Sequence, residues 1–302
     1  MKHYLSLLMI CLLGLTACDK GDPAPVEGVT RIADFQSKFV NTRHIDVWLP
    51  PAYHEDTSRR FPVIYMHDGQ NLFDSKSTWN GEAWEVDSVL TKLSDEGKID
   101  PHIVVGAWNT KDRFLEYAPQ KPFEQMSEAE QKIYFDKWGE DQIPFAADQY
   151  LRFLVEELKP LIDGRFRTLP ETEHTTVMGS SMGGLISAYA ISTHPEVFGK
   201  AGCFSTHWPL DNLPDEFAYT YSMGRYLTRN LPDSNGVRIY FDYGDQGLDA
   251  MYEPHQQLID SFMHAHGYTD SHWQTRGFPG HAHSEVAWRE RFAIPAVFLL
   301  AE

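Results

Sequence analysis

Gly179-Ser180-Ser181-Met182-Gly183-Gly184 decides the fold of this chain, and it directly follows the apolar run Thr175-Thr176-Val177-Met178. The hexapeptide contains G-x-S-x-G centred on Ser181, the pattern of a nucleophile elbow, in which a serine on a sharp strand-to-helix turn exposes its hydroxyl. Glycines are needed on both flanks because strand and helix approach too closely to leave room for a Cβ. A helix is predicted directly after it, over 185–191. The alternative is a glycine-rich turn with an incidental serine, but the order of strand, motif and helix favours the elbow.

The rest of the chain alternates between predicted strands and helices. Besides the elbow strand, apolar runs predict strands at 62–66, 102–107, 200–204, 237–243 and 272–277, and helical spacing predicts helices at 83–93, 146–162, 253–266 and 285–300. Alternation at 38–40 and 44–49 predicts an antiparallel hairpin at the start of the domain. This order predicts a mainly parallel sheet of about eight strands covered by helices on both faces, the α/β-hydrolase fold. Two segments, 109–143 and 208–235, interrupt the alternation and are candidate lids and pocket walls.

The N-terminus has the features of a bacterial targeting segment. Lys2 and His3 precede an apolar run from Tyr4 to Leu13, which is too short to span a bilayer as a permanent helix. Leu15-Thr16-Ala17-Cys18 resembles a lipobox, whose cysteine is lipidated; the alternative is an ordinary cleaved signal with a chance cysteine. We expect a lipoprotein signal peptide over 1–18, a flexible tether over 19–30 and one catalytic domain over 31–302. Lipidation at Cys18 would anchor the protein in the cell envelope, on the periplasmic or outer-surface side.

Composition excludes several classes of partner. The net charge of −17 argues against nucleic acid, which needs clustered Lys and Arg, and against electrostatic adhesion to anionic lipid. Membrane attachment is therefore expected only through the N-terminal lipid. No intrachain disulfide is expected in the domain, since Cys203 is its single cysteine and fits a buried strand. No metal or other cofactor is predicted: His264 and His266 do not share a helix face, and His281 and His283 lack a third ligand at metal-site spacing.

A serine nucleophile needs a base, and the base needs an acid that orients it. In α/β-hydrolases these follow in the order serine, acid, histidine. His281 and His283 are the candidate bases, on the segment between the last predicted strand and the last helix. Asp249 and Asp245 are the candidate acids; Asp242 is disfavoured because it is still within the strand pattern. Asp249 is preferred because Asp245 is well placed to form the turn itself.

The tetrahedral intermediate of acyl transfer needs two backbone N–H donors. Met182, the residue after the nucleophile, should supply one. The other is expected from the loop His67-Asp68-Gly69-Gln70-Asn71, where a glycine stands beside polar residues after a predicted strand. Gln70 N–H is the preferred donor with Asn71 nearby, and an ordinary strand-capping turn is the alternative.

Several separated motifs, in the correct order, resemble one family of proteins. These are HDGQNLFD at 67–74, GSSMGGL at 179–185, HPEVFG at 194–199 and G-x-x-H-x-E-x-x-W at 280–288. An FSxxxW segment corresponds only loosely to Phe204, Ser205 and Trp208, with one spacer residue fewer. From Phe39 to Leu299 the chain resembles an esterase family of α/β-hydrolases that includes esterase D, feruloyl and acetyl esterases, ferric-siderophore esterases and the antigen 85 mycolyltransferases. The bacterial "predicted hydrolase" branch is the most similar.

This resemblance implies roles for particular residues. It places the catalytic histidine on His283 rather than His281, favours Asp249 through a Gly-x-x-x-Leu-Asp run, and puts the oxyanion donor after Asp-Gly on Gln70. Arg113 begins an R-x-x-E-Y match that either binds substrate or anchors the lid by an ion pair. The candidate substrate-binding residues are Asn71, Trp79, Arg113 and Trp208. Aromatic rings near the mouth, also including Trp84, Trp108 and Trp138, could stack on sugars or phenols or could pack beneath a lid.

The resemblance leaves the substrate open. We expect a serine esterase that acts through a Ser-His-Asp triad and an acyl-enzyme on carbohydrate-linked feruloyl or acetyl esters or similar small esters. Siderophore-lactone hydrolysis or acyl transfer to an alcohol are the alternatives within the family, although this acidic chain offers no obvious basic pocket for catecholates. A non-catalytic binding lipoprotein is the remaining alternative.

Overall fold

The computed structural model describes residues 24–78, 80–139, 143–211, 217–233 and 236–301, so the signal peptide with Cys18, the first five residues of the tether (19–23) and Trp79 lie outside the described residues. The elements, in chain order, are β1 (Val29–Phe35), β2 (Arg43–Trp48), α1 (Ala52–Glu55), β3 (Val63–His67), η1 (Gly69–Asn71), η2 (Ser75–Ser77), α2 (Val86–Asp95), β4 (Ile103–Ala107), α3 (Arg113–Tyr117), α4 (Gln120–Glu124), α5 (Glu128–Trp138), α6 (Ala147–Arg152), η3 (Phe153–Leu158), α7 (Lys159–Arg165), η4 (Thr172–His174), β5 (Thr175–Ser180), α8 (Met182–Thr193), β6 (Lys200–Phe204), α9 (Ala218–Asn230), β7 (Arg238–Gln246), η6 (Gly247–Met251), α10 (Tyr252–Ala265), β8 (Trp273–Ala282), α11 (Glu285–Arg291) and α12 (Ala293–Leu300).

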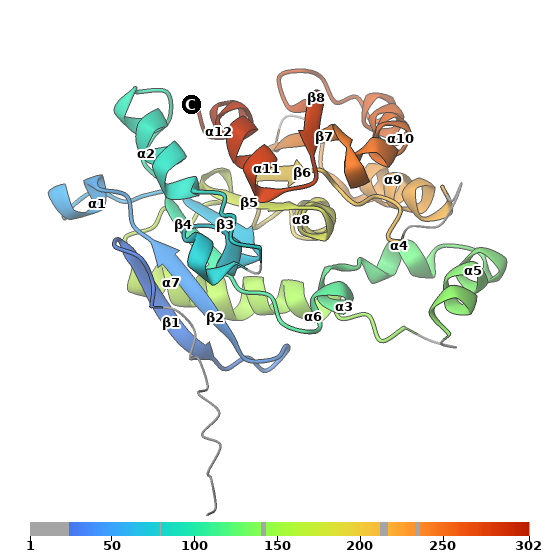
Figure 1. The fold of residues 1–302 in the computed structure, drawn as a ribbon, viewed down its shortest axis with the longest axis horizontal. Helices are drawn as coiled ribbons and strands as arrows, with labels where there is room; N and C mark the ends of the chain where they lie inside the picture. Colours follow the sequence, from blue (N-terminus) through green and yellow to red (C-terminus); the bar gives the residue numbers. More distant parts are fainter. Residues whose placement is uncertain (1–23, 79, 140–142, 212–216, 234–235, 302) are drawn as a thin grey trace, which may run out of the picture.

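One eight-stranded sheet runs through the molecule in the order β1-β2-β4-β3-β5-β6-β7-β8 (Figure 1). Every neighbouring pair from β4 to β8 is parallel, whereas β1 pairs with β2, and β2 with β4, in antiparallel fashion. The predicted α/β-hydrolase fold class is therefore confirmed. In a parallel sheet all carboxyl ends meet at one edge, where the connections can assemble a site from distant parts of the chain.

The two faces of the sheet bury different helices. Alternate strand residues such as Tyr65 and Val177 join the helices α6, α8, α9 and α10 in the larger core cluster. Their neighbours Met66 and Met178 join α2, α11 and α12 in the smaller one. Side chains that alternate along a strand point to opposite faces of the sheet, so both faces of these strands are buried beneath helices. Figure 1 shows α2, α11 and α12 on one side of the sheet and α6 and α7 on the other.

The first strand of the N-terminal hairpin is not where the sequence predicted it. β1 lies at Val29–Phe35, which includes the last two residues assigned to the tether, and the chain bends at 38–40 where a strand was predicted. The cause is local: the Ser37 hydroxyl accepts the backbone N–H groups of Phe39 (3.0 Å) and Val40 (3.2 Å). A serine side chain that takes these donors replaces a strand partner.

Two predicted helices are interrupted, and two strands are longer than predicted. The helix expected at 146–162 consists of α6 and α7 joined by the π-helical segment η3. The last helix divides at Phe292 into α11 and α12, and Pro295 in the first turn of α12 has no N–H to continue the earlier hydrogen bonds. β7 extends to Gln246 and β8 to Ala282, so both run past the predicted strand ends toward the candidate catalytic residues.

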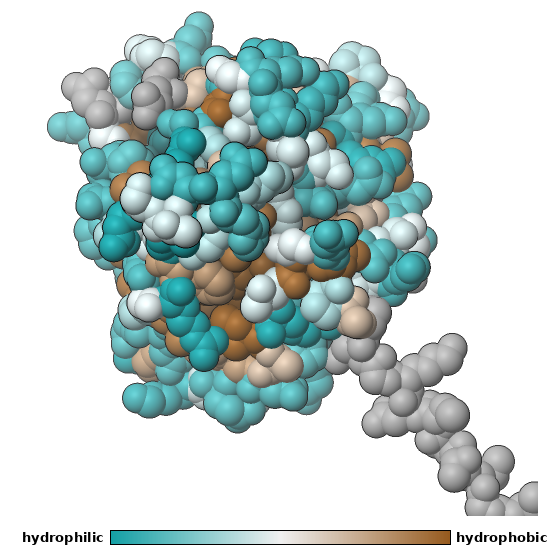
Figure 2. Space-filling view, turned by 90° about the vertical axis from the view of Figure 1, so that its left-hand side faces the viewer, coloured by the Kyte–Doolittle hydropathy of each residue, from teal (hydrophilic) through white to brown (hydrophobic). Residues whose placement is uncertain are grey.

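The two predicted wall segments pack on one another beside the sheet. The first contains α3, α4 and α5, the second contains α9, and the Tyr219 hydroxyl of α9 donates to the Pro119 carbonyl at 2.9 Å. In the part of the chain that the structure describes, no helix is long and apolar enough to cross a membrane. Figure 2 views the molecule from the left-hand side of Figure 1 and shows apolar residues gathered in a band across a mostly hydrophilic face.

Candidate active site

Ser181 occupies a strained elbow between β5 and α8. Its backbone angles, φ 60° and ψ −123°, are in a region that non-glycine residues rarely adopt, at a cost of about 1–3 kcal/mol. The turn is tight, because a Cβ on Gly179 would lie 2.8 Å from the Gly183 backbone. The Ser181 N–H donates to the Phe204 carbonyl at 2.8 Å, which ties the elbow to β6. Strain that is held by packing in this way is typical of functional positions.

His283 and Asp249 face one another at the same edge of the sheet. His283 Nδ1 lies 2.6 Å from Asp249 Oδ1, although the two residues are 34 positions apart in the chain. Asp249 is fully buried, and its Oδ2 accepts the Gly244 N–H at 2.7 Å. Burial raises the pKa of Asp249, but the hydrogen bonds from His283, Ser205 and Gly244 outweigh it and leave that pKa below its usual value. An ionised carboxylate here fixes the proton of His283 on Nδ1 and leaves Nε2 free to accept one.

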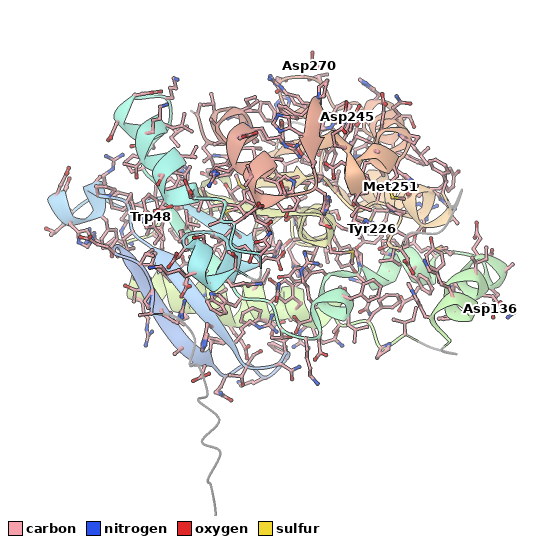
Figure 3. The ribbon with its side chains drawn as sticks, in the orientation of Figure 1. Trp48, Asp136, Tyr226, Asp245, Met251 and Asp270 are labelled. Atoms are coloured by element: carbon pink, nitrogen blue, oxygen red, sulfur yellow. The ribbon has the colours of Figure 1, made fainter. Side chains whose placement is uncertain are left out.

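The competing residues are placed elsewhere. Asp245 is exposed at the end of β7, where its Oδ1 accepts the Gly280 N–H of β8 at 2.7 Å (Figure 3). His281 is within β8 and has its Nδ1 3.4 Å from the Ala287 carbonyl. The structure therefore pairs Asp249 with His283 and leaves Asp245 and His281 outside that pair.

Tyr252 connects this pair to the elbow, and the sequence analysis missed it. Its ring lies 5.8 Å from the His283 ring, centroid to centroid, and its buried hydroxyl contacts the Ser181 side chain. The same hydroxyl is 2.7 Å from His207 Nδ1. Burial, followed by the charge of His283, lowers the pKa of His207 to about 4, so the imidazole that shares this hydrogen bond with the tyrosine hydroxyl is neutral at neutral pH. Only the position of Tyr252, three residues after Asp249, could have indicated its role.

The predicted oxyanion loop packs directly against the elbow. Asp68 adopts φ 56°, and Gly69, Gln70 and Asn71 form the single turn η1. A Cβ on Gly183 would lie 3.4 Å from Asp68 Oδ2, so this loop and the start of α8 are in contact. Gln70 and Met182 each stand in a first helical turn, where backbone N–H groups have no partner within the helix. Both predicted oxyanion donors thus lie at the same junction.

Asn71 and Gln70 have side chains that fasten the loop. Asn71 is buried and donates to Glu285 Oε1 at 3.1 Å, which joins the loop to the start of α11 next to His283. Gln70 Oε1 accepts the Asn109 N–H at 3.2 Å. The contacts of Asn71 indicate a positioning role instead of the predicted contact with substrate.

The R-x-x-E-Y match anchors the first predicted wall segment to the oxyanion loop and to β2. Arg113 forms two hydrogen bonds to Asp68, Nε to Oδ1 at 2.7 Å and Nη2 to Oδ2 at 2.8 Å. Glu116 pairs with the buried Arg43 of β2 at 2.5 Å, and the Tyr117 hydroxyl accepts the Asp68 N–H at 3.3 Å. Burial raises the pKa of Asp68, but the charge and hydrogen bonds of Arg113 leave it lowered. Of the two predicted roles for Arg113, these contacts favour the ion-pair anchor.

The tryptophans expected near the mouth are mostly structural. Trp208 is fully buried and donates its indole N–H to Gln256 Oε1 at 2.7 Å, which corrects the prediction that it binds substrate. Trp84 is buried and stacks on Trp288. The ring of Trp138 is partly buried and packs on Phe114, whose side chain is exposed. An indole ring whose N–H has a hydrogen-bond acceptor is stable when buried in the protein. The sequence pattern does not distinguish such a buried tryptophan from one that stacks on a substrate ring.

The described residues contain no group of three His, Cys, Asp or Glu side chains that could hold a metal ion. Cys203 is a free, buried residue of β6, as predicted, and burial raises the pKa of its thiol.

A cavity of about 350 Å³ opens at the opposite end of the strands, between residues such as Pro62, Lys200 and Arg238. It is remote from Ser181, because these residues lie at the amino ends of β3, β6 and β7.

Solved structures show the class of fold. A ferulic acid esterase is 18% identical to this chain with a TM-score of 0.64, over 90% of this chain and 97% of that one. The enterobactin esterase of Shigella flexneri is 18% identical with a TM-score of 0.65, over 91% of this chain and 60% of that one. The chain thus has the α/β-hydrolase fold. More specifically, it belongs to the family described as "Putative esterase", whose model matches residues 37–294.

Three relatives show the range of that similarity. The Bacillus subtilis protein YbbA, which is uncharacterised, is 26% identical over 57% of this chain, and a Xylanibacter ruminicola endo-1,4-beta-xylanase/feruloyl esterase is 26% identical over 81%. The ferri-bacillibactin esterase BesA of Bacillus subtilis is 27% identical over 49%. The matches span 60%, 27% and 49% of the lengths of these relatives, respectively.

Proposed function

We propose that this protein is a serine carboxylic-ester hydrolase with the triad Ser181, His283 and Asp249. The observation that carries the proposal is the 2.6 Å contact between His283 Nδ1 and Asp249 Oδ1 beside a strained serine elbow. Family membership supports the class of reaction. A buried acid, an oriented histidine and a half-buried serine on a sharp turn form the arrangement that activates a hydroxyl.

The geometry supports a two-step reaction. Ser181 Oγ attacks the ester carbonyl carbon while His283 Nε2 takes its proton, and the N–H groups of Gln70 and Met182 stabilise the oxyanion. The intermediate collapses to an acyl-enzyme as His283 protonates the leaving alcohol. A water molecule then gives a proton to His283 and attacks the acyl carbon. The second tetrahedral intermediate collapses as the bond to Ser181 Oγ breaks and His283 returns the proton to that oxygen, so that the acid leaves and the enzyme is regenerated. Asp249 stays ionised throughout and stabilises the imidazolium form of His283.

We infer that the substrates are carbohydrate-linked acyl esters of the feruloyl or acetyl type, on the strength of the feruloyl esterase relative. BesA is named a ferri-bacillibactin esterase and one structural neighbour an enterobactin esterase, which makes siderophore lactones the second candidate. Transfer of the acyl group to an alcohol is the third candidate. The targeting pattern at 1–18 supports an envelope lipoprotein anchored through Cys18.

The test is hydrolysis of a short p-nitrophenyl ester by the wild type, Ser181→Ala and Ser180→Ala. We expect Ser181→Ala to lose about 10⁴-fold or more in kcat and the adjacent-serine control to stay near the wild type. Activity retained by Ser181→Ala would refute the proposal. A panel of methyl ferulate, acetylated xylan and a catecholate trilactone, with and without a sugar acceptor, then separates the three substrate classes.

A further inference from the structure

Ser205 lies directly after β6 and has no part in the reaction described above. It is fully buried and adopts φ 40°, an unusual angle for serine that is held by its N–H, which donates to Asp242 Oδ1 at 2.9 Å. Its hydroxyl is 2.5 Å from Asp249 Oδ2, 2.9 Å from Trp288 Nε1 and 2.7 Å from Arg291 Nη2. One small side chain thus contacts the predicted triad acid and two residues of α11.

The chemistry of these partners determines which way the hydroxyl points. An indole N–H and a guanidinium N–H can only donate, so Trp288 and Arg291 occupy the two lone pairs of Ser205 Oγ. The single hydroxyl hydrogen can then go only to Asp249 Oδ2, which is a pure acceptor when ionised. All three hydrogen-bonding positions of the serine are filled. A rotated hydroxyl would lose the bond to Asp249, so only one orientation of Ser205 Oγ–H preserves this set.

The charges around Asp249 make this contact important. Arg291 is buried, pairs with Asp242 Oδ1 at 2.8 Å, and has its Nη2 3.9 Å from Asp249 Oδ2. Burial raises the pKa of Asp242 to about 6, although Arg291 opposes the shift. The titratable groups around the Asp249–His283 pair are Asp242 on β7, Arg291 on α11, Tyr252 on α10 and His207 after β6. Since Arg291 is paired with Asp242, the bonds from Ser205 and Gly244 supply the direct stabilisation of Asp249 Oδ2.

We propose that Ser205 is a positioning residue of the active site, which holds the Asp249 carboxylate with Oδ1 toward His283 and links it to Trp288 and Arg291. This inference rests on the proposed function, because it assigns Ser205 a task only if Asp249 is the triad acid. Ser205 touches neither substrate nor the reacting atoms and acts through Asp249 alone.

Ser205→Ala tests the proposal, since it removes the donor to Asp249 and leaves two buried N–H groups without their acceptor. We expect kcat for a p-nitrophenyl ester to fall about tenfold to hundredfold with little change in KM. The acid limb of the kcat/KM profile should move to higher pH, because a carboxylate with one donor fewer stabilises the imidazolium form of His283 more strongly. Ser205→Gly, which tolerates φ 40°, should reproduce both effects and so separate the hydroxyl from backbone strain.

Ser192→Ala is the matched control, because Ser192 is also buried but its hydroxyl donates only to the Tyr189 carbonyl at 3.0 Å. It should change thermal stability without moving the pH profile. Two results would overturn the positioning role. The first is a wild-type kcat in Ser205→Ala. The second is an acid limb that does not move, with a loss of activity no larger than the loss of folded protein. Ser181→Ala, measured in parallel, tests the proposed function itself: activity in that variant refutes the triad whatever Ser205 does.

Discussion

Asp249→Asn removes the charge of the proposed triad acid but keeps the size and shape of its side chain. Oδ2 of Asp249 receives the Ser205 hydroxyl at 2.5 Å and the Gly244 N–H at 2.7 Å, while Oδ1 faces His283. An asparagine should keep its carbonyl oxygen at the Oδ2 position, because the flipped amide would aim its own N–H groups at both donors. That flip would lose two hydrogen bonds at about 0.5–1.5 kcal/mol each and leave buried donors unpaired.

The amide NH₂ of the variant must therefore face His283 Nδ1. Nδ1 then has to be the acceptor, so the imidazole carries its proton on Nε2 and cannot take the proton of Ser181. The expected loss in kcat is about 10⁴-fold, or about 5 kcal/mol of transition-state stabilisation. We expect little loss of folded protein, since the variant keeps the volume of the side chain and both contacts at the Oδ2 position.

The assay is kcat/KM for p-nitrophenyl acetate near pH 8, with circular dichroism to verify folding. Asp245→Asn is the matched control, because Asp245 is exposed and only 4 positions away in the chain. We expect it to stay within about twofold of the wild type. If folded Asp249→Asn keeps more than about a tenth of the activity, or if Asp245→Asn is the inactive variant, the reasoning is refuted.

Two further predictions concern the oxyanion loop and the buried histidines. Gly69→Ala should abolish activity and lower stability by about 1–3 kcal/mol, because the added Cβ would lie 2.5 Å from the Gly106 backbone. Gly164→Ala in α7 is the control: its Cβ meets no atom within 4 Å, so stability should stay the same or rise. Equal activity in both variants would contradict this prediction. Burial is the main cause that lowers the pKa of three histidines, to about 3 for His67 and to about 4 for His102 and His207. Their pKa in the unfolded chain is about 6.5, so below that pH the unfolded state binds more protons than the folded state. As pH falls from 6.5 toward 4, each histidine should therefore lower the free energy of unfolding by up to about 1.4 kcal/mol per pH unit. Urea denaturation between pH 7.5 and 5 measures this slope, and a flat profile would contradict the buried neutral histidines.

The sequence predicts well what is encoded locally. The elbow at Ser181 is contained in one hexapeptide whose glycines are required by close backbone approach, and the structure has that turn between β5 and α8. The alternation of strands and helices likewise predicted the parallel sheet. The pairing of Asp249 with His283 agrees with the predicted order of residues, while their catalytic roles stay predictions that the variants above test.

What depends on contacts between distant segments could not be predicted. Trp208 is buried because Gln256 offers an acceptor for its indole N–H, and nothing near residue 208 in the sequence indicates that partner. The strand predicted at 38–40 failed because the Ser37 hydroxyl took its backbone donors. Ser205 gave only a loose motif match, since its importance depends on donors that α11 brings from more than 80 positions away.

The most direct test of the central claim is covalent trapping of the nucleophile. A fluorophosphonate should add once per chain, and peptide mass spectrometry should locate the adduct on Ser181. Labelling should disappear in Ser181→Ala, persist in Ser180→Ala and slow strongly in His283→Ala, because His283 activates the serine. An adduct on any other residue, or ester hydrolysis that continues after complete labelling, would contradict the account.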